Sequence, residues 1–217
     1  PECGDGLFSP PAGSGPIGIG ADCPAGIPGA TDEVLFDFEL DEDGWTPTGL
    51  WHRTDAACVG DLTPPTGTSY FYFGQDDVCN YDTGLPEQGY LTSQQIMLSA
   101  APTPYTLVFD YLLETDLGAP ITDWATAELS LDGVTFTEIA DNCAVTGNNL
   151  CDDREWHTAY VTLDGYLDDG LGGTQPFFWL RFGFTTGDED ALPPADCYLG
   201  FVVDNVRIMS GSSITCD

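Results

Sequence analysis

From residue 34 onward the chain consists of short runs of apolar, aromatic and β-branched residues, separated by clusters of Gly, Pro, Asn and Asp. Runs of this kind are typical of β-strands, whereas a helix needs a longer segment with a period of 3.6 residues. Many short strands in succession indicate an antiparallel sandwich. We expect strands at residues 34–40, 49–53, 69–74, 89–98, 104–114, 124–131, 134–140, 156–163, 176–186 and 198–208.

Three of these runs make more specific predictions. Residues 125–131 and 134–138 alternate on either side of Asp132-Gly133, which predicts a hairpin with a two-residue turn. Residues 177–184 are aromatic on both faces, so we expect this strand in the middle of a sheet, with Arg181 paired to an acidic side chain. The chain has no helical pattern and no internal repeat of the kind that solenoids and propellers need.

The cysteines indicate the compartment. There are 8 of them, an even number without a CxxC motif and with only 2 His, which favours a disulfide framework over zinc sites. Disulfides persist in oxidising surroundings, and the chain begins at Pro1 without a signal segment, so we expect a mature secreted or cell-surface protein. The expected short-range pairs are Cys58 with Cys79 and Cys143 with Cys151, which leaves Cys3, Cys23, Cys197 and Cys216 for the two ends.

The charge of the chain excludes several partners. Asp and Glu number 36 against 4 basic residues, which gives a formal net charge of −32. A surface with this much negative charge repels phosphate, which makes nucleic acid and anionic membranes poor partners. In addition, no apolar run approaches the roughly 20 residues that span a bilayer. The counter-charge is either bound cation, for which calcium on carboxylate and carbonyl oxygens is the usual choice, or dissolved salt around a solvated acidic face.

The chain divides into three segments: an extended tail at residues 1–33, a sandwich at 34–211 and a short C-terminal tail at 212–217. Gly, Pro and Ala dominate the N-terminal tail, and this density of helix and strand breakers excludes a helix or a central strand. The tail nevertheless carries apolar residues suited to filling a groove on its own domain or on a neighbouring molecule. These residues are Leu7, Phe8, Ile17, Ile19 and Ile27.

A series of sequence landmarks follows in a fixed order along residues 34–209. They include Phe36-Asp-Phe-Glu39, Gly44-Trp45, Leu50-Trp51-His52, Tyr72-Phe73-Gly74, Gly89-Tyr90-Leu91, Leu129-Ser-Leu-Asp-Gly133 and Val203-Asp204-Asn205-Val206. In order and spacing these landmarks resemble the MAM-like jelly-roll modules of secreted bacterial proteins. The resemblance implies an all-β jelly-roll sandwich of two antiparallel sheets, preceded here by the Gly/Pro-rich tail. It implies no single function, because this fold serves binding, adhesion and assembly alike.

The same resemblance implies a structural calcium between the first and last strands. The matching residues are Glu39 and Asp41 at the end of the first strand and Asp204 on the last. Carboxylates at strand ends can supply the 6 to 8 oxygens that calcium takes. Two other acidic clusters are candidates: Asp188-Glu189-Asp190 with Asp196, and Asp76-Asp77 near Asn80 and Asp82.

An enzymatic function has little support. Glu39, Asp41 and Asp43 would face one way on a strand, as the acids of some jelly-roll glycoside hydrolases do, but Gly44 follows at once and favours a turn. The chain lacks the short motifs of nucleophile, zinc-protease and nucleotide chemistry. We interpret His52 and His157 as structural and expect a non-catalytic protein, with a glycoside hydrolase as the alternative.

Two non-catalytic hypotheses remain. The first is an extracellular subunit that assembles head to tail into a filament, with residues 1–33 docked on the next copy. The alternative is a carbohydrate-binding or adhesion module, with Trp45, Trp51 and Trp124 as candidate sugar-stacking residues. Core packing is the other interpretation of these residues, and it is favoured for Trp45 and Trp51 because they match landmarks of the module. The Thr-Pro loops are candidate sites for O-linked sugar, which would make the chain a glycoprotein.

Overall fold

The structure is a computed structural model of the whole chain. It describes residues 31–55, 57–59, 62–99, 104–116, 123–142, 149–168, 174–187 and 198–211. Most of the predicted N-terminal tail, the C-terminal tail and the acidic segment 188–196 lie outside these ranges. The predictions that rest on them, including the assembly residues and the pairing of four cysteines, remain predictions.

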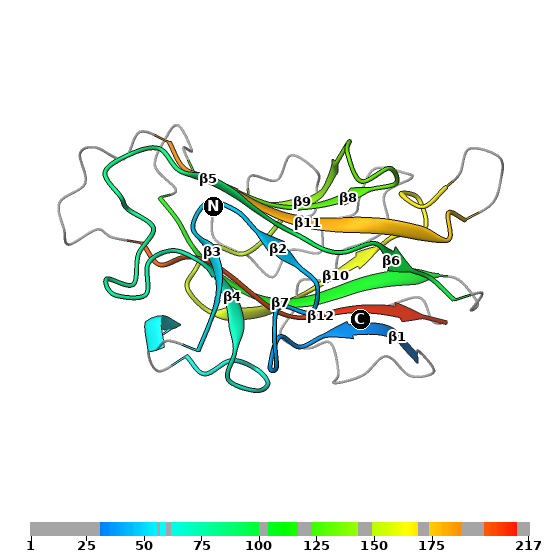
Figure 1. Cartoon of the computed structure of the whole chain (residues 1–217), viewed down its shortest axis with the longest axis horizontal. Helices are drawn as coiled ribbons and strands as arrows, with labels where there is room; N and C mark the ends of the chain where they lie inside the picture. The colour runs from blue at the N-terminus through cyan, green and yellow to red at the C-terminus, as the bar shows by residue number, and fades with distance from the viewer. Residues whose placement is uncertain are drawn as a thin grey trace.

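The protein is an all-β sandwich of two antiparallel sheets, which confirms the predicted fold class (Figure 1). Sheet A has the order β10-β7-β12-β4-β3, with β1 also paired to β12, and sheet B has the order β2-β5-β11-β8-β9, with β6 also paired to β11. The strands of sheet A are β1 (Thr31–Phe36), β3 (Trp51–Thr54), β4 (Tyr70–Phe73), β7 (Tyr105–Glu114), β10 (Trp156–Thr162) and β12 (Gly200–Ser210). Those of sheet B are β2 (Thr46–Pro47), β5 (Gln88–Thr92), β6 (Ile96–Met97), β8 (Trp124–Ser130), β9 (Thr137–Asp141) and β11 (Phe177–Thr185).

Most of these strands coincide with runs that the sequence predicted as strands. The run at 89–98 is divided into β5 and β6, and the short β2 has too little sequence to show a pattern. Within the described ranges the only helical element is one 3₁₀ turn, η1 (Ala57–Val59), and no helix has the length and hydrophobicity needed to cross a membrane. The first strand begins earlier than expected, at Thr31, because it pairs with the C-terminal half of β12.

The predicted two-residue turn between β8 and β9 is wrong. β8 ends at Ser130 and β9 begins at Thr137, so residues 131–136 form a longer connection. The carboxylate of Asp132 accepts hydrogen bonds from the backbone N–H groups of Val134 and Thr135, which replace the ladder bonds of a tight hairpin. Phe136 therefore lies before the start of β9, where its ring contacts Arg181 on β11.

The core lies between the two sheets and consists mainly of aromatic side chains. Alternate residues of β11 point inward, so Phe178, Phe182 and Phe184 are buried, and they meet Phe73 and Phe109 from sheet A. The rings pack mostly edge-to-face, the arrangement that aromatic quadrupoles prefer. The prediction that the aromatic strand lies inside a sheet is confirmed, since β11 pairs with β5 on one side and β8 on the other.

The outer face of sheet A is closed by a second, smaller apolar cluster. Tyr70 and Tyr72 on β4 point outward and are covered by residues of the β3–β4 connection, with Leu112 and Val202 beneath. The connection is tied down by the disulfide between Cys58 and Cys79, whose Cα atoms are 4.9 Å apart. This is the pairing that the sequence predicted. Cys151 is buried, and its expected partner Cys143 lies outside the described residues.

Candidate binding face and candidate metal centre

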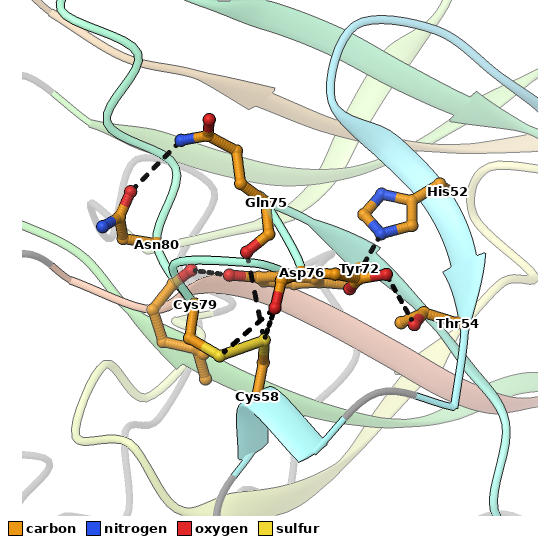
Figure 2. The surroundings of a disulfide bond; sticks show 9 residues. His52, Thr54, Cys58, Tyr72, Gln75, Asp76, Cys79 and Asn80 are labelled. Carbon is orange, nitrogen blue, oxygen red and sulfur yellow. Dashed lines mark hydrogen bonds and ion pairs between the residues drawn. A yellow bond between two sulfur atoms is a disulfide. The ribbon is translucent and has the colours of Figure 1, made fainter.

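Both histidines form structural pairs. His52 on β3 lies 3.1 Å from Asp76 in the turn that carries Cys79, and Thr54 donates to the same carboxylate at 3.0 Å (Figure 2). His157 likewise lies 2.8 Å from Asp153. Figure 2 places the His52 pair beside the disulfide, where it anchors the turn.

The predicted acidic cluster around Asp76 does not converge on one point. Asp76 is held by His52 and Thr54, whereas the Asn80 side chain accepts from the Gln75 amide and the Asp82 backbone N–H. These groups stabilise the turn among themselves. Among the residues that the structure describes here, no three acidic or histidine side chains converge into a metal cage.

The outer face of sheet B differs in composition from that of sheet A. Residues directly opposite one another on antiparallel strands point to the same side, so the strand register aligns side chains in rows across the sheet. One row crosses five of the six strands, and the rows beside it contain Tyr90 with Thr126, Gln88 with Thr185 and Trp124, and Trp179 with Ser130. The full row is Thr46, Thr92, Arg181, Glu128 and Glu138. We call this surface the polar–aromatic face.

Arg181 is the centre of the polar–aromatic face. Its Nε donates to Glu128 Oε2 at 2.8 Å, and Nη2 donates to the same oxygen. The guanidinium carbon lies 4.1 Å from the centroid of the Tyr90 ring and 3.9 Å from that of Phe136. The predicted acidic partner of Arg181 is therefore Glu128, whose other carboxylate oxygen accepts from the Thr126 hydroxyl at 2.8 Å. Cation–π contact and ion pairing together fix the guanidinium in place.

Two glycines allow side chains to approach closely on this face. A Cβ atom at Gly183 would lie 2.6 Å from the Thr126 hydroxyl, so only glycine lets Tyr90, Thr126 and Glu128 meet above β11. Gly133 has a φ of +73°, and a Cβ there would lie 3.2 Å from the Trp179 ring. The rings of Tyr90 and Trp179 are consequently half-buried by their neighbours, with part of each exposed.

Two of the three tryptophans chosen from the sequence lie in the core and cannot stack on a sugar. Trp45 and Trp51 are each 3% exposed, because Trp45 stacks on Phe182 and Trp51 packs against Phe73 and Phe201 in the core. The carbohydrate prediction for these two residues is therefore wrong. Trp124 is half-buried at the start of β8 and belongs to the polar–aromatic face.

Sequence reasoning missed Tyr90, Phe136 and Trp179 as surface aromatics. Tyr90 and Trp179 alternate with the core residues Leu91, Leu180 and Phe182 along their strands. That alternation was the available signal for Tyr90 and Trp179. In β11 it was hidden, because both faces of the strand are aromatic.

The second feature is a buried carboxylate cluster on the outer side of sheet A. Asp204 on β12 lies opposite Asp110 on β7 and is completely buried. Its Oδ1 accepts from the Asn205 backbone N–H at 2.7 Å, but its buried Oδ2 has no hydrogen-bond partner. Both oxygens of Asp110 are used, one by the Thr158 hydroxyl and one by the Asn205 side-chain amide. An unpaired buried carboxylate oxygen is costly and requires a proton or a cation.

The electrostatic surroundings of Asp204 also favour a bound proton or a cation at its carboxylate. Burial is the main cause that raises the pKa of Asp204 to about 8; the Asn205 N–H lowers this pKa, and the negative charges of Asp110, Glu39 and Asp37 add to the increase. Glu39 is thus within electrostatic range of Asp204, and the calcium site that the sequence predicted for the two residues stays a prediction. At neutral pH the Asp204 carboxyl holds a proton unless a cation replaces it.

Glu39 and Asp41 lie in different surroundings. Glu39 Oε1 accepts from the backbone N–H groups of Thr68 and Ser69 at 2.9 and 2.8 Å, and chiefly the Ser69 bond lowers its pKa. Asp41 is exposed, and its Oδ1 accepts from the Asp43 backbone N–H at 2.8 Å. Its assignment to the calcium site is not supported, because it is committed to a turn after β1.

The proposed hydrolase acids are divided by the same turn. β1 ends at Phe36, so Glu39, Asp41 and Asp43 follow the strand and do not share one of its faces. Asp43 Oδ2 accepts from the Phe38 backbone N–H at 3.0 Å, whereas Glu39 reaches the β3–β4 connection. The three carboxylates have separate structural partners.

No protein-family model matches the chain, and no curated protein matches it in sequence. Structural neighbours include the K1 cleaved adhesin domain of Lys-gingipain from Porphyromonas gingivalis W83, with 13% identity, TM-score 0.47 and coverage of 82% of this chain and 98% of that one. The C-terminal family 22 carbohydrate-binding module of Clostridium thermocellum Xyn10B has 10% identity, TM-score 0.44 and coverage of 85% and 97%. The CBM22-1 xylan-binding domain of Paenibacillus barcinonensis Xyn10C has 9% identity, TM-score 0.40 and coverage of 85% and 98%.

These neighbours are bacterial adhesin and carbohydrate-binding β-sandwich modules. At such low identities, and with TM-scores below 0.5, the likeness assigns neither a family nor a ligand to this chain. The MAM-like resemblance remains a resemblance.

Proposed function

We propose that the chain is a non-catalytic extracellular binding module that takes a glycan on the polar–aromatic face of sheet B. The observation that carries this proposal is the combination of half-buried aromatic rings with hydroxyl and amide side chains in register on one face. Sugar rings present flat C–H faces to aromatic rings and hydroxyls at their edges, so they need both kinds of group. The disulfide of Cys58 and Cys79 supports an extracellular location.

The arrangement of the face supports a chain of several sugars. Trp179 and Gly183 are four residues apart on β11, and Tyr90 lies opposite Gly183, so the two rings are separated by roughly 14 Å along the strand at about 3.4 Å per residue. Thr92 lies opposite Arg181, midway between them, and Thr185 and Gln88 lie beyond Tyr90. The residues that we assign to the ligand are Tyr90, Thr92, Trp124 and Trp179, with Glu128 and Arg181 as positioning residues.

The test is binding to a panel of soluble oligosaccharides, measured by glycan array and then by calorimetry. Trp179→Ala and Tyr90→Ala should each weaken binding at least about tenfold, which is ~1.4 kcal/mol. Tyr160→Ala is the matched control, because Tyr160 is a half-buried aromatic residue on β10 of the other sheet. Failure of the wild type to bind any glycan, or equal losses in all three variants, would refute the proposal.

We also propose a structural calcium at Asp204. Bound calcium would supply positive charge to the unpaired Oδ2 and to the surrounding carboxylates. Within the described ranges no three His, Cys, Asp or Glu side chains converge into a metal cage, so Asp204 would be the anchoring ligand and backbone oxygens or waters would complete the shell. Glu39 and Asp110 would contribute mainly through their charge.

The calcium proposal predicts a metal-dependent stability at neutral pH. Chelation should lower the midpoint of thermal unfolding of the wild type, since a ligand bound only to the native state stabilises it by mass action. The Asp204→Asn variant should show no response to calcium or chelator, because a neutral amide satisfies the site without a cation. Asp41→Asn is the matched control and should respond like the wild type. A wild type that is insensitive to chelation at low salt would mean that Asp204 holds a proton.

A further inference from the structure

We infer that the polar–aromatic face selects uncharged glycans and excludes acidic ones, with Glu138 as a residue that enforces this selectivity. This inference rests on the proposed glycan-binding function and specifies its ligand. It depends on which charges the face presents and on which of them a ligand can reach.

Positive charge on this face is limited to Arg181. The chain has 4 basic residues and no Lys, and the other three are Arg53 on β3, Arg154 before β10 and Arg207 on β12. All three belong to sheet A or its connections. Because the whole sequence contains no further Lys or Arg, no other segment can bring a basic side chain to sheet B.

The guanidinium of Arg181 is already occupied. Two of its nitrogens donate to Glu128, and rings lie at 4.1 Å and 3.9 Å from its central carbon, from Tyr90 and Phe136. A carboxylate or sulfate group binds arginine best along a nitrogen edge, in a bidentate pair. The edge that contains Nε and Nη2 is used by Glu128, whose carboxylate neutralises the charge of Arg181. The N–H groups of the other edge, on Nη1 and Nη2, can donate to a sugar hydroxyl.

The rest of the face is negative. Glu138 on β9 lies opposite Glu128 and is exposed, with no basic partner among the described residues. Burial, followed by the charges of Asp141 and Glu128, raises the pKa of Glu138, which reflects this crowding of acids. Ser130 lies directly opposite Trp179, and its hydroxyl donates to Asp132, which adds a further carboxylate to this face. An acidic sugar lying across these rows meets several carboxylates and no available cation.

The uncharged groups of the face suit a neutral ligand. Thr46, Thr92 and Thr185 offer hydroxyls, and Gln88 offers an amide that also contacts the Tyr90 hydroxyl at 3.0 Å. Hydroxyls and amides both donate and accept, as sugar hydroxyls do. The Glu138 carboxylate lies beside these groups and acts through its charge, which repels a sugar carboxylate and leaves a neutral sugar unaffected.

The experiment compares matched ligands by calorimetry at low salt and at 0.5 M NaCl. The probes are neutral oligomers of β-linked glucose, mannose and galactose, and the same oligomers oxidised at C6 to carboxylates. High salt reduces the Debye length to about 4 Å and suppresses the repulsion of the chain's net charge of −32, so selectivity that persists there comes from the face itself.

We expect the wild type to bind a neutral oligomer at both salt concentrations and its oxidised counterpart at least about tenfold more weakly. Glu138→Gln should strengthen binding of the oxidised oligomer by about two- to fivefold at low salt and leave the neutral one unchanged. Asp32→Asn is the matched control, because it removes an exposed acid from β1 of the other sheet and should change neither.

The outcomes separate the two proposals. Equal or tighter binding of the oxidised oligomer by the wild type would overturn the selectivity and leave the glycan-binding function intact. An unchanged preference in Glu138→Gln would overturn the role of Glu138. If no oligomer of either class binds, the proposed function fails and the inference fails with it. Circular dichroism of each variant confirms that the fold is retained.

Discussion

Both sheets have six strands, but their outer faces differ in what covers them. On sheet A, Tyr70 and Tyr72 are buried beneath the β3–β4 connection, which the Cys58–Cys79 disulfide holds in place. On sheet B, Tyr90 and Trp179 are half-buried among Thr, Gln, Glu and Arg side chains. A tyrosine on sheet A therefore contributes to stability, whereas a tyrosine on sheet B is available to a ligand. The same residue type has a different role because of what lies above it.

The largest expected effect comes from opening the cover of sheet A. Tyr72→Ala should reduce the free energy of unfolding by about 3 to 5 kcal/mol, because it leaves a cavity in the cluster and removes the hydrogen bond from the Tyr72 hydroxyl to the Leu199 carbonyl. Tyr90→Ala, the matched change on sheet B, should cost about 1 to 2 kcal/mol. Urea unfolding measures both values. Equal losses would contradict the distinction between the two faces.

Removing the disulfide tests the cover without creating a cavity. Replacing both Cys58 and Cys79 by alanine should lower the free energy of unfolding by ~3 kcal/mol, since the bond closes a loop with a sequence separation of 21 residues. Glycan affinity should be unchanged, because the disulfide lies on sheet A. A loss of both stability and affinity would show that the two faces are coupled.

Asp132 offers a smaller test on the sheet B side. Hydrogen bonds from the backbone N–H groups of Thr135 and Val134 lower its pKa to about 2. A carboxylate with a lowered pKa stabilises the fold above its ordinary pKa of about 4, and that stabilisation is lost as the pH falls towards 2. Asp132→Ala should lower the unfolding midpoint at pH 7 and reduce its acid dependence between pH 4 and 2. Asp77→Ala, an exposed acid near the disulfide, should leave that acid dependence unchanged.

The smallest effect on the sandwich is expected from deleting residues 1–30, because β1 begins at Thr31 and keeps its pairing with β12. With Cys197 and Cys216 replaced by serine to avoid unpaired thiols, the variant should fold and remain monomeric. If the full chain forms filaments in calcium by electron microscopy and the deletion variant does not, the predicted head-to-tail assembly stands. Filaments from the deletion variant, or a full chain that stays monomeric, would exclude it.

The sequence itself determined the sandwich, the order of its strands along the chain and one disulfide. Strand runs such as 104–114 and 156–163 can be recognised locally, because alternation and β-branched composition depend only on neighbouring residues. It could also be foreseen that the partner of Arg181 is an acid, since a half-buried guanidinium requires one. Which acid it was could not be foreseen, because the chain contains 36 of them.

Only the tertiary structure decided which aromatic residues are exposed. Trp45 and Trp51 had two interpretations from the sequence, sugar stacking and core packing, and the closing of one sheet over the other buries both. Strand register placed Arg181 and Glu128 in one row and Tyr90 in the next, although Tyr90 and Arg181 are 91 positions apart in the sequence. Register is set by pairing between distant strands and by packing of the inner face, so the candidate site is a property of the folded sandwich and of no single segment.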